Sequence, residues 1–134
     1  MTIKCILLTY REHVAHGDAS RPVYVDESGK RYHLGNHTIT IDSGETLEPA
    51  PVGAMWDADW FAGETGSHGL NYSRNPDGIV LCVRCPGGDW MVDGPSSSNG
   101  SWSRTGTVPN VTVTPSILQP TYHGWLRNGE LVAV

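Results

Sequence analysis

Glycine and proline occur throughout this chain and constrain its fold more than any other feature. They account for 16 and 9 of its 134 residues, and no convincing long amphipathic helix fits between them. Both residues weaken helix interiors, whereas both are favoured in turns. Several of the segments that they separate are rich in strand-forming residues. We therefore expect a mainly β fold, either all-β or a β-dominated α+β fold.

The length of the chain predicts one domain that covers residues 1–134. A chain of this size buries enough surface to fold without disulfides or a metal. We expect residues 1–42 to form an N-terminal β-meander and residues 79–134 to form C-terminal hairpins around the same core. Residues 43–78 are expected to be a connection and a long loop.

Three hairpins are predicted by the turns at their tips. The turn signals are Asp-Glu-Ser-Gly at 26–29, Cys-Pro-Gly-Gly at 85–88 and Asn-Gly at 128–129. Asn-Gly is the strongest of these signals, because a type I′ hairpin turn needs positive φ at both central positions. The strands expected to flank these turns are residues 21–25 and 30–34, 79–84 and 89–92, and 122–127 and 130–134.

Three further segments have apolar patterns that predict local structure. Residues 2–10 have apolar side chains on both faces, which is typical of a central strand. Residues 38–42 alternate Thr and Ile, which predicts a half-buried strand. Residues 55–61 are expected to form one helical turn, in which Trp56 and Trp60, four residues apart, share a face.

The charge of the chain argues against nucleic acid as a partner. The formal net charge is −5, from 14 acidic and 9 basic residues, and the acidic residues are scattered. A protein that binds a phosphate backbone is normally basic, and a protein that mimics DNA needs a dense acidic face. We therefore expect no nucleic-acid partner.

The cysteines and the apolar segments indicate a compartment. The chain has three cysteines, an odd number, and no recognisable secretory signal, which favours free thiols in a reducing cytoplasm. No segment approaches the roughly 18 apolar residues that span a bilayer, so we expect a soluble protein with no membrane partner.

Cys82-x-x-Cys85 has the spacing of one half of a zinc site. His123 and His68 are the candidates to complete it, although Cys82 also alternates with its neighbours like an ordinary strand residue. A redox role would need a helix N-terminus, which the predicted strand does not provide. We expect no cofactor, with zinc on Cys82, Cys85 and His123 as the alternative.

Trp90, Asp93, Ser96 and Trp102 lie where a predicted strand passes into a polar loop. Aromatic walls with hydroxyls and a carboxylate suit a sugar, a base or a small polar ligand. The alternative is that both tryptophans pack in the core or at an edge. The full set of candidate ligand-binding residues is Trp56, Asp59, Trp60, Trp90, Asp93, Ser96, Trp102, His123 and Trp125.

Evidence for catalysis is weaker than evidence for binding. A serine nucleophile in the polar loop would need a base, and His123 is the only candidate that we identify. The chain has no phosphate-binding glycine loop and no His-Glu-x-x-His zinc motif. These absences favour a binding protein over an enzyme.

Several spaced motifs in residues 53–134 form a connected pattern. They are Gly-Ala-Met-Trp-Asp-Ala-Asp-Trp at 53–60, Asn-Pro-Asp-Gly at 75–78, Val-Arg-Cys-Pro-Gly-Gly at 83–88, Trp-Met-Val-Asp-Gly-Pro at 90–95, Ser-Ile at 116–117 and His-Gly-Trp-Leu at 123–126. This pattern resembles a family of small bacteriophage proteins of unknown function. The resemblance implies an accessory protein that acts during infection, in the cytoplasm of the host cell.

That family is distantly similar to a small bacterial domain found near ubiquitin-like operons, which has a cysteine cluster and a suspected metal. In this chain Gly87 and Asp89 stand where further cysteines are expected. The resemblance therefore implies at most a reduced metal site on Cys85 and His123, with Cys82 as a replacement ligand.

These observations lead to three expectations about function. The first is a phage-type accessory protein that binds a host protein or small ligand, including one that serves to blunt a host defence. The second is a metal-dependent hydrolase or a zinc-stabilised domain. The third is a structural component of the virion. The oligomeric state is not indicated by the sequence.

Overall fold

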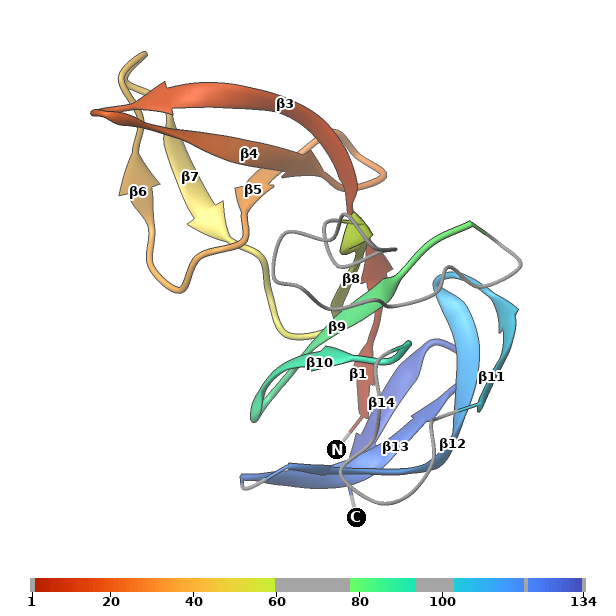
Figure 1. Ribbon diagram of the computed structural model, residues 1–134. Coiled ribbons are helices and arrows are strands. Elements are labelled where there is room, and N and C mark those ends of the chain that lie inside the picture. The colour runs from red at the N-terminus through yellow and green to blue at the C-terminus, as the bar shows by residue number, and fades with distance from the viewer. Residues whose placement is uncertain (1, 60–77, 94–102, 120, 134) are drawn as a thin grey trace.

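The computed structural model describes residues 2–59, 78–93, 103–119 and 121–133 (Figure 1). These residues form fourteen strands in three sheets and contain no α-helix. The prediction of a mainly β fold is therefore confirmed. No helix in the described part of the chain is long and apolar enough to cross a membrane.

The C-terminal sheet is antiparallel throughout and has the strand order β1-β14-β13-β12-β11. Its strands are β1 (Thr2–Lys4), β11 (Ser103–Thr107), β12 (Asn110–Gln119), β13 (Tyr122–Arg127) and β14 (Glu130–Ala133). The predicted hairpin at its centre is confirmed, because β13 pairs with β14 across Asn128 and Gly129. These two residues have φ of 47° and 77°, as a type I′ turn requires.

The middle sheet has the strand order β10-β9-β8-β2. Its strands are β2 (Ile6–Leu7), β8 (Ala54–Asp57), β9 (Leu81–Cys85) and β10 (Gly88–Met91). The predicted β9–β10 hairpin is confirmed, with Cys85 opposite Gly88. The helical turn expected from residue 55 onward is wrong for β8, which pairs with β2 on one side and β9 on the other. A strand buried on both faces and a buried helix have similar apolar patterns.

The N-terminal sheet has the strand order β3-β4-β5-β7-β6. Its strands are β3 (Thr9–His16), β4 (Ala19–Val25), β5 (Arg31–His33), β6 (Ile39–Thr40) and β7 (Thr46–Pro49). The predicted β4–β5 hairpin is confirmed, with Tyr24 opposite Tyr32. The strand expected at residues 38–42 corresponds to β6, and Ile41, which follows it, is buried.

The expectation of one central strand at residues 2–10 is wrong. This segment divides into β1, β2 and the start of β3, and each of these strands lies at the edge of a different sheet. Its apolar residues face two directions because Cys5 packs in one core cluster and Leu8 in another. The segment therefore connects all three sheets, which follow one another from top to bottom in Figure 1.

The middle sheet is covered on both faces. Met55 and Val83 face the C-terminal sheet, where they join the largest core cluster. Trp56 and Cys82 face the opposite way and join a second cluster with Tyr24 and other residues of the N-terminal half. A smaller third cluster lies within the N-terminal sheet. The hydrophobic contacts thus stack the three sheets on one another.

Candidate functional site

A groove of about 870 Å³ lies where the three sheets meet, and we call it the three-sheet groove. Its apolar walls come from Leu7, Leu8, Pro22, Ile79 and Val108. Its polar lining consists of Thr9, Tyr10, His13, Tyr24, Asp57, Asp59 and Thr107. Pockets for small molecules have volumes of roughly 300–1,000 Å³ and mostly apolar walls with a few polar groups. The three-sheet groove has the size and lining of such a pocket.

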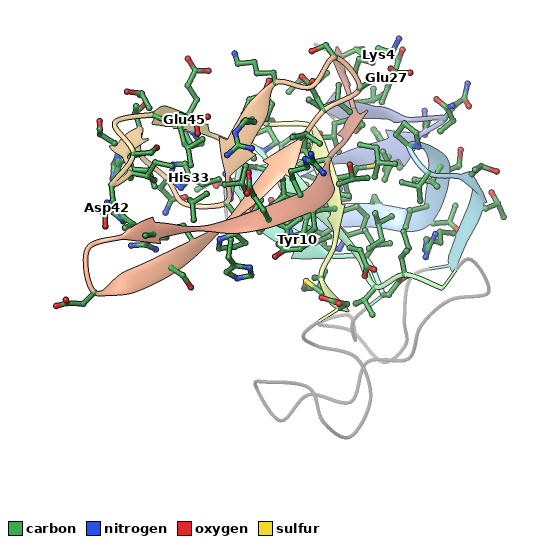
Figure 2. All side chains as sticks on the ribbon, turned by 90° about the horizontal axis from the view of Figure 1, so that it is seen from above. Lys4, Tyr10, Glu27, His33, Asp42 and Glu45 are labelled. Atoms are coloured by element: carbon green, nitrogen blue, oxygen red, sulfur yellow. The ribbon has the colours of Figure 1, made fainter. Side chains whose placement is uncertain are left out.

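A β-bulge directs two side chains of β3 into this groove. Tyr10 lies opposite Tyr24 on β4, but the register then shifts, so that Glu12 lies opposite Val23. Arg11 is the extra residue of the bulge, which places Tyr10 and His13 on the same face although they are three residues apart. The Tyr10 hydroxyl and His13 Nδ1 are 2.6 Å apart and form a hydrogen bond. Figure 2 shows Tyr10 on β3.

β8 and the residues that follow it add an acidic part to the groove lining. Asp57 ends β8, and its Oδ1 accepts a hydrogen bond of 2.9 Å from the backbone N–H of Val80. Asp59 follows two residues later and is exposed. Burial, together with the negative charges of Asp59 and Asp57, raises the pKa of the Tyr24 phenol to about 12. The carboxylates therefore make the potential around the Tyr24 hydroxyl negative.

Two of the tryptophans expected at a ligand site lie in the core instead. Trp56 is 2% exposed and Trp90 is 5% exposed. The sequence left open whether Trp90 binds a ligand or packs in the core or at an edge, and its burial agrees with packing. Asp59 is the predicted ligand-binding residue that does line the three-sheet groove. The predicted residues Trp60, His68, Ser96 and Trp102 lie outside the described residues.

The Asp93 carboxylate accepts hydrogen bonds from a side chain and from the backbone. Its carboxylate accepts two hydrogen bonds from Arg104, of 2.9 and 3.1 Å, and a third of 2.8 Å from the backbone N–H of Leu81. The side chains of Arg104 and Asp93 are 6% and 4% exposed. This buried ion pair connects the end of the middle sheet to β11 of the C-terminal sheet.

The candidate metal ligands are not brought together. Cys82 and Cys85 are three residues apart on β9, so their side chains point to opposite faces and pack in different core clusters. Burial raises the pKa of both thiols, that of Cys85 to about 12, so both are protonated at neutral pH. Among the described residues, no group of three or more His, Cys, Asp or Glu side chains could hold a metal ion.

His123 and Trp125 lie on the solvent-facing side of β13, away from the groove. Their rings are 6.1 Å apart, and the Arg127 guanidinium stacks over Trp125 at 4.5 Å. The Ser116 hydroxyl is 3.5 Å from His123 Nε2, at the limit of a hydrogen bond. These residues form a row along one face of the strand and do not enclose a cavity.

His33 is buried, and both of its ring nitrogens form hydrogen bonds. Its Nδ1 accepts from the Gly35 backbone N–H at 3.1 Å, so Nε2 carries the proton that it donates to the His37 carbonyl at 2.6 Å. Burial is the main cause that lowers the pKa of this ring, and nearby arginines act in the same direction. A second proton would break the bond from Gly35.

We expect His33 to make the protein less stable as the pH falls below about 6.5. The folded pKa is lower than the unfolded pKa, so the unfolded chain binds more protons in this range and acid favours unfolding. Urea unfolding at a series of pH values measures the effect. His33→Gln should flatten the dependence, whereas His37→Gln, which keeps the backbone carbonyl, should not. Equal slopes for His33→Gln and the parent protein would contradict this assignment.

Known proteins give no further guide to the site. No protein-family model, curated protein or solved structure gives a significant match to this chain. Of its polar residues, the sequence indicated only Asp59. Tyr10, His13 and Tyr24 were missed because no local pattern marks the bulge that brings them together.

Proposed function

We propose that this protein is a non-enzymatic binding module that takes a small ligand in the three-sheet groove. The observation that supports this proposal most is the groove itself, with a volume of about 870 Å³, apolar walls from all three sheets and a few polar groups. A concave site of this kind fits a small molecule better than it fits the flat surface of a partner protein.

The resemblance of residues 53–134 to bacteriophage proteins supports a molecule of the host cell as the ligand. A binding module made during infection would act by sequestering this molecule, and withholding a signal from a defence pathway is one use of such an activity. This role requires no catalytic residues. It requires a site that is already formed in the folded protein.

Binding of Nile red, a neutral dye that fluoresces in apolar surroundings, tests the proposal. We expect saturable binding of one dye per chain. Thr107→Trp places a large ring at the groove and should weaken binding about tenfold or more, equivalent to about 1.4 kcal/mol. Thr105→Trp, at an exposed threonine of the same strand that does not line the groove, is the matched control.

The control should bind the dye as the parent protein does. Circular dichroism and thermal unfolding establish that both variants are folded. The proposal fails if the parent protein binds no dye, or if both substitutions weaken binding equally while the fold is kept.

A further inference from the structure

The charged groups of the three-sheet groove are predominantly acidic. Asp57 and Asp59 lie on one side, and no described lining residue is Lys or Arg. His13 is the only described lining residue with a basic side chain, and its Nδ1 is occupied by the Tyr10 hydroxyl. A ligand that carries a positive charge would therefore be favoured in this groove over an anion.

Tyr24 provides a second, independent indication of a ligand. The residue is 4% exposed and lines the groove, and its hydroxyl makes no hydrogen bond to any described residue. The hydroxyl itself is not one of the fully buried polar atoms, so it opens into the groove, where a ligand can reach it. A hydroxyl oxygen can accept a hydrogen bond from an N–H group of a ligand.

Two tyrosine rings add to the attraction for a cation. Tyr10 and Tyr24 pack edge to face, with ring centroids 5.9 Å apart. Tyr10 is 54% exposed, so part of its ring is accessible from solvent. Aromatic faces attract ammonium groups through their quadrupoles, and carboxylates accept strong hydrogen bonds from them.

We propose that the ligand of the three-sheet groove is an organic ammonium ion with an apolar body. The ammonium group lies between Asp59 and the Tyr24 hydroxyl, beside the Tyr10 ring. The apolar body lies against the walls formed by Leu7, Ile79 and Val108. This inference rests on the proposed function, since it names the class of ligand for the same groove.

Three probes that share one apolar body and differ in charge test the inference. They are phenylbutylamine, which is a cation, phenylbutanol, which is neutral, and phenylbutyrate, which is an anion. Isothermal titration calorimetry at low salt should give the amine an affinity at least about tenfold higher than that of the alcohol, as a charge-assisted hydrogen bond provides. The carboxylate should bind most weakly.

Asp59→Asn tests the contribution of the carboxylate. This residue is exposed and makes no hydrogen bond or ion pair to the described part of the chain, so the variant should fold normally. We expect its affinity for the amine to fall about tenfold, toward that of the alcohol, while its affinity for the alcohol stays within about twofold. Tyr24→Phe removes only the hydroxyl and should also weaken the amine selectively. Asp18 is an exposed acid in the β3–β4 turn, so Asp18→Asn should change neither the affinity for the amine nor the affinity for the alcohol.

The outcomes separate the two proposals. If the alcohol binds to the parent protein as tightly as the amine, the preference for a cation is wrong although the groove still binds ligands. If Asp59→Asn and Asp18→Asn lower the affinity for the amine equally, the inference also fails, since the attraction is then only that of the net charge. If neither the probes nor Nile red bind, both the preference for a cation and the proposed function fail.

Discussion

Replacing Arg84 with leucine is expected to lower the free energy of unfolding by about 3–5 kcal/mol, the usual loss when a buried charged network is broken. Arg84 is 8% exposed and lies on the face of β9 that packs toward the N-terminal sheet. Its guanidinium donates to the carbonyls of Leu34, Gly35 and Ala50 at 2.6, 3.1 and 2.9 Å. It also forms two hydrogen bonds with Asp89.

Loss of this side chain would leave three carbonyls without their donor and would remove the main polar link between the middle and N-terminal sheets. Urea unfolding followed by tryptophan fluorescence measures the effect. Arg11→Leu is the matched control, because Arg11 is exposed and substitutions at such positions usually change stability by less than about 0.5 kcal/mol. A loss below about 1 kcal/mol for Arg84→Leu would show that the link is not important for stability.

Asp93→Ala is the second substitution for which we expect a large effect, again about 3–5 kcal/mol. It removes the carboxylate that accepts two hydrogen bonds from the buried Arg104 guanidinium, and it removes the acceptor for the Leu81 N–H. The double variant Asp93→Ala with Arg104→Met should be less destabilised than the sum of the two single variants, because no buried charge is left behind.

This prediction also decides between two interpretations of Asp93. The sequence suggested a ligand-binding carboxylate, whereas the ion pair indicates a structural one. If Asp93 is structural, Asp93→Ala lowers the melting temperature. A variant that keeps its melting temperature but loses ligand binding would instead support the first interpretation.

The hairpins could be predicted because the information for them is local. Asn128 and Gly129 specify a turn whatever surrounds them, and the turns at 26–29 and 85–88 behave in the same way. The remaining topology depends on distant partners. Ile6 pairs with Ala54, and Thr2 pairs with Val132. An apolar run does not identify the sheet that it joins, so residues 2–10 looked like one strand.

The groove could be predicted only in part for the same reason. Asp59 was among the predicted ligand-binding residues, but Trp56, three residues before it, is a core residue. Tryptophan buries the largest apolar surface of any side chain, and a chain with few helices needs such residues to join its sheets. Tyr10 and His13 share a face only because β3 contains a bulge. A bulge of this kind follows from the pairing of two strands and not from either strand alone.

The division of residues 2–16 among three sheets affects how the protein is made. The ribosome releases these residues before their partner strands, so β1 has no partner until β14 has been synthesised, and β2 must wait for β8. Contacts between segments so far apart close slowly, because the chain between them must first lose its freedom. The hairpins can form as they emerge from the ribosome. The C-terminal and middle sheets gain β1 and β2 only afterwards, so we expect the three-sheet groove, which Leu7 of β2 lines, to be one of the last parts of the molecule to form.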